Sequence, residues 1–212
     1  MDLTLYHYWR SSSSWRVRWA LEHKKTACKL TPVNLLKNEQ NSTEHLKRNP
    51  AGLVPCLEIS NQGKTSYLSE SVAIIEWLEE TQAGPALLPK DAIDRARVRQ
   101  LVQIINADIQ PIQNLRVLQK HSSDQVQKNA WATHWIDLGF KAYEHICGDL
   151  HKTFSIGTEI TMADLFLIPQ CYNARRFDID LERYPIINKI FNTAMATEAC
   201  QKSAPENYQP KD

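Results

Sequence analysis

The sequence predicts two consecutive domains, a small α/β domain followed by an all-helical one. Over residues 1–82, short runs of alternating apolar and polar side chains are interleaved with segments of helical periodicity. Residues 83–90 contain two prolines and a glycine and have little periodicity, which is typical of a linker. Over residues 91–212 the apolar side chains follow only helical spacing. This order predicts a mixed four-stranded sheet with helices on both faces, and then a helical bundle.

The first strand and helix meet at four consecutive serines. Residues 3–8 alternate as a half-buried strand does, and Val17, Ala20 and Leu21 have the spacing of the buried side of a helix. Between them, the hydroxyls of residues 11–14 are suited to capping the helix N-terminus. One serine would suffice for a cap, and a helix start rich in hydroxyls also favours an anion such as a thiolate. The cluster therefore favours a functional role over a purely structural turn.

The rest of the α/β domain follows from local signals. Asn-Gln-Gly-Lys at residues 61–64 predicts a hairpin, and Ser69 is expected to cap a helix that ends near Thr81. The remaining segments are strands over 27–33, 54–59 and 65–68 and a short helix over 43–47.

The second domain is predicted from helical spacing alone. A long helix over residues 98–109 should be kinked or broken at Pro111, and a second one contains residues 131–143. Thr161 and Asp164 form a capping-box-like start for a largely buried helix. A last helix over residues 185–195 is followed by a polar tail from Gln201.

Composition narrows the possible partners. The 212 residues are 42% hydrophobic and 23% charged with a net charge of +1, so neither nucleic acid nor an anionic membrane is an expected partner. No apolar run approaches the ~20 residues of a membrane-spanning helix, and the N-terminus has no signal pattern. The five cysteines are scattered without a C-x-x-C pair, and the histidines lack the spacing of metal ligands. These features predict a cytoplasmic protein without a metal site.

Several motifs, in the right order, resemble the zeta class of glutathione transferases, which includes maleylacetoacetate and maleylpyruvate isomerases. The motifs are Ser11–Arg18, Pro32–Lys37, Asp108–Pro111 with Asn114, and Asn173–Phe177. The resemblance implies a thioredoxin-like domain over residues 1–82 and a helical, substrate-binding domain over residues 91–212. One departure is notable, because the family usually carries cysteine where this chain has Ser13.

The resemblance implies that glutathione is the cofactor. Ser11 matches the family's catalytic serine and Ser12 its neighbour, and Val54 would pair through its backbone with the tripeptide beside a cis Pro55. At the start of the next helix, Ser71 would receive the γ-glutamyl carboxylate and Glu70 the amine. Considered alone, these two residues would more simply form an ordinary helix start. The full implied set is Ser11, Ser12, Ser13, Gln40, Val54, Pro55, Glu70 and Ser71.

The implied reaction is the cis–trans isomerisation of maleylacetoacetate to fumarylacetoacetate in aromatic amino acid breakdown. An acidic substrate and a developing enolate need cations, for which Arg10, Arg116 and Arg176 are the candidates. Each could instead be a structural or surface ion-pair residue. Ser11, Ser12, Arg10 and Arg176 are the expected catalytic set, and a homodimer is expected from the family.

Three alternatives remain open from the sequence. They are a general transferase acting on α-halo acids, a maleylpyruvate isomerase, and a related fold used only for binding or assembly. The last should have lost the serines or the Glu70–Ser71 pair, and both are present.

Overall fold

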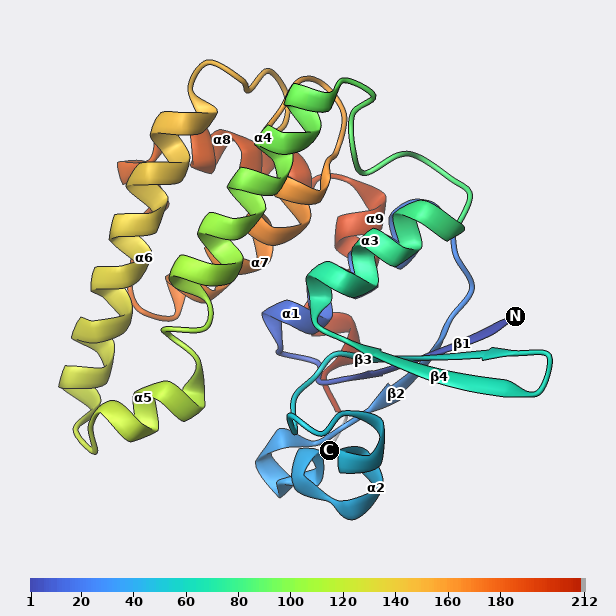
Figure 1. The fold of residues 1–212 in the computed structure, drawn as a ribbon. Helices are drawn as coiled ribbons and strands as arrows, with labels where there is room; N and C mark the ends of the chain where they lie inside the picture. The colour runs from blue at the N-terminus through green and yellow to red at the C-terminus, as the bar shows by residue number, and fades with distance from the viewer. Residues whose placement is uncertain (211–212) are drawn as a thin grey trace. The chain divides into compact units, whose positions relative to one another are not determined.

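The computed structural model describes residues 1–210, which divide into two compact units (Figure 1). The first unit comprises residues 1–86 together with the chain from Glu198 onward, and the second comprises Leu87–Thr197. The C-terminal segment thus groups with the α/β unit, whereas the sequence places it in the helical domain. The reason is specific packing, since the indole Nε1 of Trp15 donates a hydrogen bond to Ser203 Oγ at 3.0 Å.

The first unit is built on a mixed four-stranded sheet of order β2-β1-β3-β4. Strand β1 pairs in parallel with β2, while β3 pairs antiparallel with both β1 and β4. Gln62 and Gly63 both have positive φ angles, of 49° and 77°, which is the backbone that a tight hairpin requires and that glycine adopts easily. The strands are β1 (Asp2–His7), β2 (Lys29–Pro32), β3 (Cys56–Asn61) and β4 (Lys64–Ser69).

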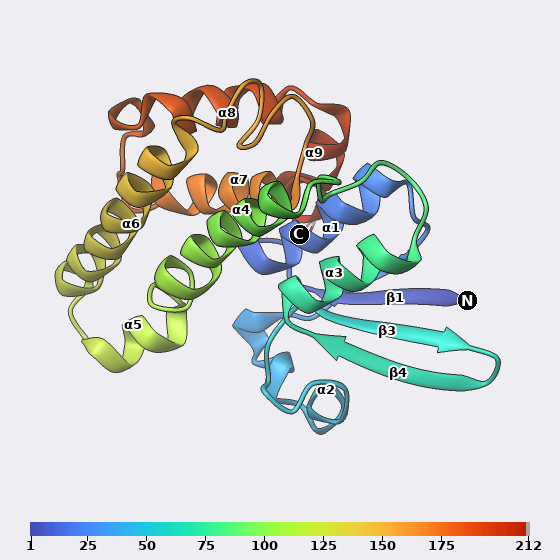
Figure 2. The same ribbon diagram turned by 45° about the horizontal axis from the view of Figure 1, so that its top comes forward.

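Helices cover both faces of this sheet, as expected. Figure 2 shows α1 (Ser12–Lys24) and α3 (Ser71–Thr81) on one face and α2 (Thr43–Arg48) on the other. Two short 3-10 turns, η1 (Leu35–Lys37) and η2 (Glu39–Asn41), precede α2. The core contains the fully buried Trp19, Leu57 and Ile74, whose apolar surface is removed from water on folding.

The described residues of the second unit form helices joined by loops. Their one β-type pairing is an isolated bridge between His151 and Gly157. The central helix of this unit is α7, in which Asp164 closes a capping box with Thr161. Asp164 is fully buried and accepts four hydrogen bonds from Ser155 and Thr161, so it stabilises the helix start as expected. The elements are α4 (Ala92–Gln103), the π-helix η3 (Ile104–Ile109), α5 (Leu115–His121), α6 (Gln125–Cys147), α7 (Met162–Arg175), the 3-10 turn η4 (Leu181–Arg183) and α8 (Pro185–Met195).

Two local expectations are wrong, and one helix was missed. The N-cap of α3 is Glu70 and not Ser69, because Ser69 still pairs with Cys56 in the sheet. Helix α5 was not expected, and it begins at an Asn114 cap just after the break at Pro111. The polar tail expected over residues 201–212 instead contains the end of α9 (Glu198–Ser203) and the 3-10 turn η5 (Pro205–Tyr208), while its residues 211–212 lie outside the described residues.

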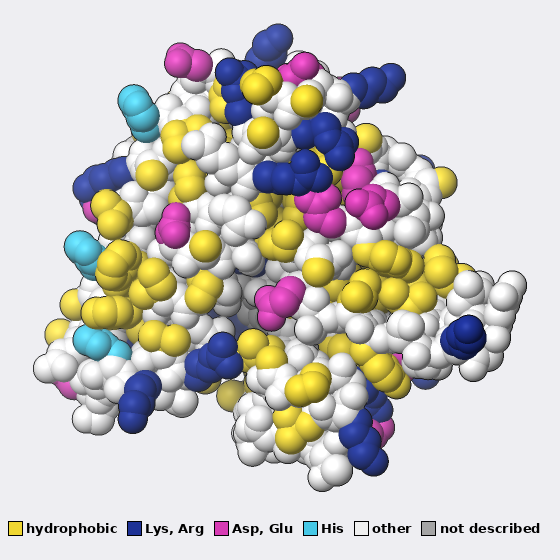
Figure 3. All heavy atoms as spheres, in the orientation of Figure 1, with side chains coloured by type: hydrophobic (Ala, Val, Ile, Leu, Met, Phe, Trp, Pro, Cys, Tyr) yellow, Lys and Arg dark blue, Asp and Glu magenta, His cyan; other side chains and the backbone are white. Residues whose placement is uncertain are grey.

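The surface carries charges of both signs. On the face drawn in Figure 3, basic and acidic side chains are interspersed with apolar ones, which fits the near-zero net charge. Over the part of the chain that the structure describes, no helix is both long and apolar enough to span a bilayer.

Candidate functional site

The register of the sheet brings three of the predicted site segments together at one end of the strands. Tyr6 pairs with Cys56, and Cys56 pairs with Ser69 on its other side. We define residues 8–14 as the serine turn. This turn therefore follows β1 at the end of the sheet where β3 begins and β4 ends. At the same end, Val54 and Pro55 directly precede β3, and Glu70 and Ser71 directly follow β4. The serine turn thus meets two segments that lie at least forty residues later in the sequence, by strand pairing alone.

Within the serine turn, Ser11 is the N-cap of α1. Its Oγ accepts a hydrogen bond from the N–H of Ser14 at 3.2 Å, and its own N–H donates to Tyr8 O at 3.1 Å. Because Oγ acts here as an acceptor, the hydroxyl proton is left to be donated outward. The N–H groups of Ser12 and Ser13 have no hydrogen-bond partner within residues 1–210. The helix start thus offers a hydroxyl and two amide donors, which suits an anionic sulfur.

The other serines have different environments. Ser12 is buried and Ser13 half-buried, while Ser14 is fully buried and accepts a hydrogen bond from the N–H of Tyr8 at 3.4 Å. Ser14 was not in the predicted site, and its role is to hold the turn. Ser14 lies three and four residues before Val17 and Arg18, which are on the buried side of α1. This helical spacing was the sequence signal that Ser14 would be buried.

The loop before β3 contains a cis peptide bond between Val54 and Pro55, as the resemblance implies. The carbonyl of Leu53 just ahead accepts hydrogen bonds from His45 Nε2 and Asn49 Nδ2, both at 2.9 Å. These two buried side chains fix the loop. The backbone N–H and C=O of Val54 make no hydrogen bond within the described chain. This open backbone edge is the feature that an extended peptide needs for strand-like pairing.

At the start of α3, Glu70 is exposed and has a φ of 68°, in the left-handed region that non-glycine residues rarely occupy. Such backbone strain is typical of functional sites. The next residue, Ser71, is buried, and its Oγ accepts a hydrogen bond from Arg16 Nη1 at 3.1 Å. Burial lowers the pKa of Arg16 to about 9, against the opposing effect of Glu70, so the guanidinium is charged at neutral pH. A buried cation beneath a helix N-terminus favours a carboxylate there.

The sequence analysis missed Arg16 as part of this arrangement. Arg16 and Arg18 both lie in the run of buried residues along α1. Arginine is rarely buried unless it is paired, so two of them in an apolar helix were the available signal.

Gln40 lies in η2 and is half-buried. Its Nε2 donates to Asn38 Oδ1 at 3.1 Å, and its Oε1 has no partner among the described residues. The binding role predicted for it remains a prediction.

The three candidate arginines are divided between the units. Arg10 belongs to the first unit, where its guanidinium lies 5.6 Å from the ring centre of Trp9. Arg116 on α5 and Arg176 at the C-terminal cap of α7 belong to the second, and both are exposed. Arg175 lies over the ring of Phe191 at 4.4 Å. Arg176 matches the arginine of the Asn-Ala-x-Arg-Phe pattern on which the resemblance rests, so its role towards a substrate remains a prediction from that resemblance.

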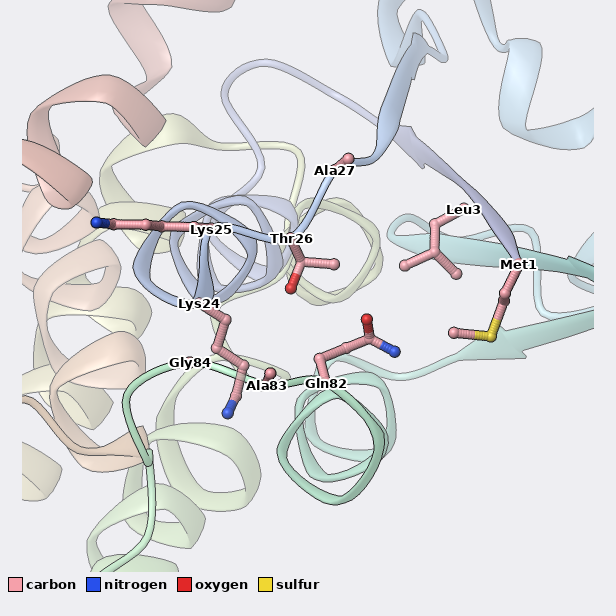
Figure 4. Close-up of a pocket in the computed structure, with 9 residues that line it drawn as sticks. All are labelled: Met1, Leu3, Lys24, Lys25, Thr26, Ala27, Gln82, Ala83 and Gly84. Atoms are coloured by element: carbon pink, nitrogen blue, oxygen red, sulfur yellow. The ribbon is translucent and has the colours of Figure 1, made fainter.

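A hollow of about 350 Å³ lies elsewhere in the first unit, around the start of β1 and the end of α1 (Figure 4). Lys24 on its wall is already paired, with Glu79 at 2.7 Å and the carbonyl of Pro85 at 3.2 Å. None of the predicted site residues lines it. Its walls are Met1, Leu3, Lys24, Lys25, Thr26, Ala27, Gln82, Ala83 and Gly84.

Comparison with known proteins decides the family. Residues 1–80 match the model of the glutathione S-transferase N-terminal domain. The chain is 45% identical over 205 residues to a probable maleylacetoacetate isomerase 2 of Drosophila melanogaster, covering 96% of this chain and 88% of that protein. The chain belongs to the zeta-class glutathione transferase family.

Two solved zeta-class relatives share the whole fold. A maleylacetoacetate isomerase of Anaeromyxobacter dehalogenans 2CP-1, with glutathione bound in its active site, is 43% identical with a TM-score of 0.91, covering 99% of this chain and 97% of that one. A holo maleylpyruvate isomerase, described as a bacterial zeta-class glutathione S-transferase, is 39% identical with a TM-score of 0.90, covering 99% of both chains. The zeta-class assignment therefore extends over both units of this chain.

Proposed function

We propose that this zeta-class protein is a glutathione-dependent cis–trans isomerase that converts maleylacetoacetate to fumarylacetoacetate. The observation that carries the proposal is the arrangement of Ser11, whose Oγ caps α1 as an acceptor and so leaves its proton for a sulfur. Relatives of 40–45% identity that are named maleylacetoacetate isomerase support it.

The polar groups at this end of the sheet are suited to the parts of glutathione. The open backbone of Val54 would pair with the cysteinyl part of the tripeptide, next to the cis Pro55. Ser71, backed by Arg16, would bind the γ-glutamyl carboxylate, and Glu70 would bind the α-amine. Gln40 would add a contact from η2.

When bound, glutathione would supply a thiolate that adds reversibly to the conjugated double bond, so that the carbon–carbon bond can rotate before elimination. A free thiol has a pKa of about 8.5, so the chain must favour the charged form. Ser11 would donate its hydroxyl proton to the sulfur, while the free N–H groups of Ser12 and Ser13 would add positive potential. Because Ser13 would contribute through its backbone, the absence of cysteine at this position is no loss of function.

The arginines would recognise the acidic substrate. Arg10 lies within the serine turn and would stabilise the enolate that develops when the thiolate adds. Arg176, with Arg116 in support, would bind the substrate carboxylate, for which the guanidinium fork is the geometric match.

Two other substrate classes fit the same residues. Maleylpyruvate carries the same maleyl group, and one structural relative is a maleylpyruvate isomerase. α-Halo acids would also use a thiolate and a carboxylate-binding arginine. We further propose a cytoplasmic homodimer in tyrosine and phenylalanine breakdown, without a nucleic-acid or membrane partner, from the family and the balanced charge.

The test is isomerisation of maleylacetone, a simpler maleyl ketone, by the purified protein. Turnover should require glutathione and should vanish when S-methylglutathione, which has no free thiol, replaces it. Turnover that is independent of the thiol would contradict the proposal. Parallel assays with maleylpyruvate and an α-halo acid then rank the three substrates by kcat/KM.

A further inference from the structure

Arg18 connects the serine turn to the C-terminal segment of the chain. It lies on α1, two residues after Arg16, the residue that binds Ser71. It is 1% exposed. Its Nη1 donates to the carbonyl of Tyr8 at 3.4 Å and its Nη2 to the carbonyl of Trp9 at 3.1 Å. Both carbonyls belong to the serine turn, and Tyr8 O also accepts the N–H of Ser11. The guanidinium therefore holds the backbone that presents Ser11.

The opposite side of Arg18 is held by residues near the C-terminus. Its Nε donates to the carbonyl of Ser203 at 3.1 Å, and its guanidinium lies 4.6 Å from the centre of the Tyr208 ring. The Tyr208 ring also meets the His7 ring edge-on at 5.6 Å. An arginine fixed by a carbonyl on one edge and an aromatic ring on its face has a single orientation available.

The remaining groups around Arg18 leave its charge in place. His7 Nδ1 lies 3.2 Å from Nη1 and accepts a hydrogen bond from it. Burial and the charge of Arg18 lower the pKa of His7 to about 4, so that ring is neutral. Burial lowers the pKa of Arg18 itself to about 10, while Tyr208 and Glu206 act in the opposite direction.

We propose that Arg18 is a positioning residue for the reaction, and that the C-terminal segment over residues 203–208 sets its orientation and thereby the geometry of the serine turn. The effect on catalysis rests on the function proposed above, whereas the effect on the turn does not. The donors that Ser11 to Ser13 present would be pre-organised by contacts made nearly two hundred residues later in sequence. Pre-organisation of donors is what an electrostatically stabilised sulfur requires.

The test compares Tyr208→Leu, which removes the ring from Arg18, with Tyr208→Phe, which keeps it. Tyr67→Leu, on the exposed part of β4, is the matched control. The first readout is hydrogen exchange at the amides of Ser11 and Ser14, measured without any ligand. Tyr208→Leu should speed this exchange about three- to thirtyfold, the range of a desolvated cation–π contact, whereas Tyr208→Phe and Tyr67→Leu should match the parent.

The second readout is the pKa of the thiol of bound glutathione, with kcat and KM. Tyr208→Leu should raise that pKa and lower kcat, with a smaller change in the KM for glutathione. Arg18→Lys keeps the charge but cannot bridge the three carbonyls, and it should change both readouts in the same direction.

Two outcomes would overturn the inference. In the first, Tyr208→Leu lowers the melting temperature but leaves the Ser11 and Ser14 exchange and the thiol pKa unchanged, so the segment only adds stability. In the second, Tyr208→Phe is as damaging as Tyr208→Leu, so the ring contact with Arg18 is not what matters. A parent protein that leaves the thiol pKa of glutathione unshifted would contradict the proposed function instead, and the exchange measurement would still decide the inference.

Discussion

The guanidinium of Arg16 on α1 donates a hydrogen bond to the hydroxyl of Ser71, the first residue of α3, at 3.1 Å. The two side chains are fully buried or nearly so, and they tie the starts of two helices together. A cation at this place should favour a carboxylate at the helix N-terminus more than the helix dipole alone would.

Ser71→Ala should therefore weaken glutathione binding about ten- to a hundredfold, because a hydrogen bond to a charged group is worth about 1.5–3 kcal/mol. Calorimetric titration of glutathione measures this directly. Ser66→Ala on the exposed part of β4 is the control and should bind normally. An unchanged Kd in Ser71→Ala would place the γ-glutamyl carboxylate elsewhere.

Arg176→Ala should lose turnover of acidic substrates about ten- to a hundredfold in kcat/KM while glutathione affinity stays nearly intact. The reason is that its proposed partner is the substrate carboxylate, which glutathione binding does not involve. Arg175→Ala is the matched control, since the packing of Arg175 on Phe191 predicts a loss of stability and normal turnover by the folded protein. Collapse of glutathione binding in Arg176→Ala would show that this residue serves the tripeptide site or the fold.

His7 makes stability depend on pH. Its pKa is about 4 in the folded protein, against 6.5 when exposed, so the unfolded chain binds more protons between these values. The stabilisation is complete above pH 6.5 and is lost as the pH falls towards 4, by roughly 3 kcal/mol at most.

Denaturant unfolding at several pH values tests this dependence, with His7→Gln expected to flatten the slope between pH 6.5 and 4. His134→Gln, at an exposed position on α6, should keep the parent's slope. If His7→Gln also keeps it, other groups govern the acid sensitivity.

Local sequence signals were enough for most of the first unit and for several helices of the second. The alternation over residues 3–8, the hairpin at Gln62–Gly63 and the helix over residues 185–195 are all present in the structure. Each depends on neighbours along the chain, so periodicity and turn chemistry specify it.

Apart from α5, which begins at the local Asn114 cap, the features that local signals missed depend on distant contacts. Helix α9 and the turn that follows it pack on α1 through Trp15 and Arg18, across about 185 residues of sequence. The buried positions of Arg16 and Arg18 depend on partners on other elements, namely Ser71 and Ser203. A polar stretch such as residues 201–208 has no periodic pattern of apolar side chains, so the sequence could not predict that it packs on α1.

The assignment of the serines came from the family resemblance, and the geometry now adds a physical distinction among them. Ser11 Oγ is already an acceptor for the Ser14 N–H, so its proton is directed outward, while the side chains of Ser12 and Ser13 have no such constraint. Ser11 is therefore the residue whose hydroxyl should matter most for the sulfur. Because Ser11→Ala also removes a helix cap, Ser11→Gly is the better variant, since glycine caps nearly as well.

The central claim is tested most directly by the ultraviolet thiolate band of bound glutathione, recorded against pH for each serine variant. Ser11→Gly and Ser11→Ala should both raise the thiol pKa towards its free value of about 8.5 and cut maleylacetone isomerisation strongly. Ser12→Ala should have an intermediate effect, and Ser13→Ala and Ser13→Cys should be mild. If Ser13→Ala is the most damaging while Ser11→Gly keeps a low thiol pKa, the claim is contradicted and Ser13 holds the sulfur.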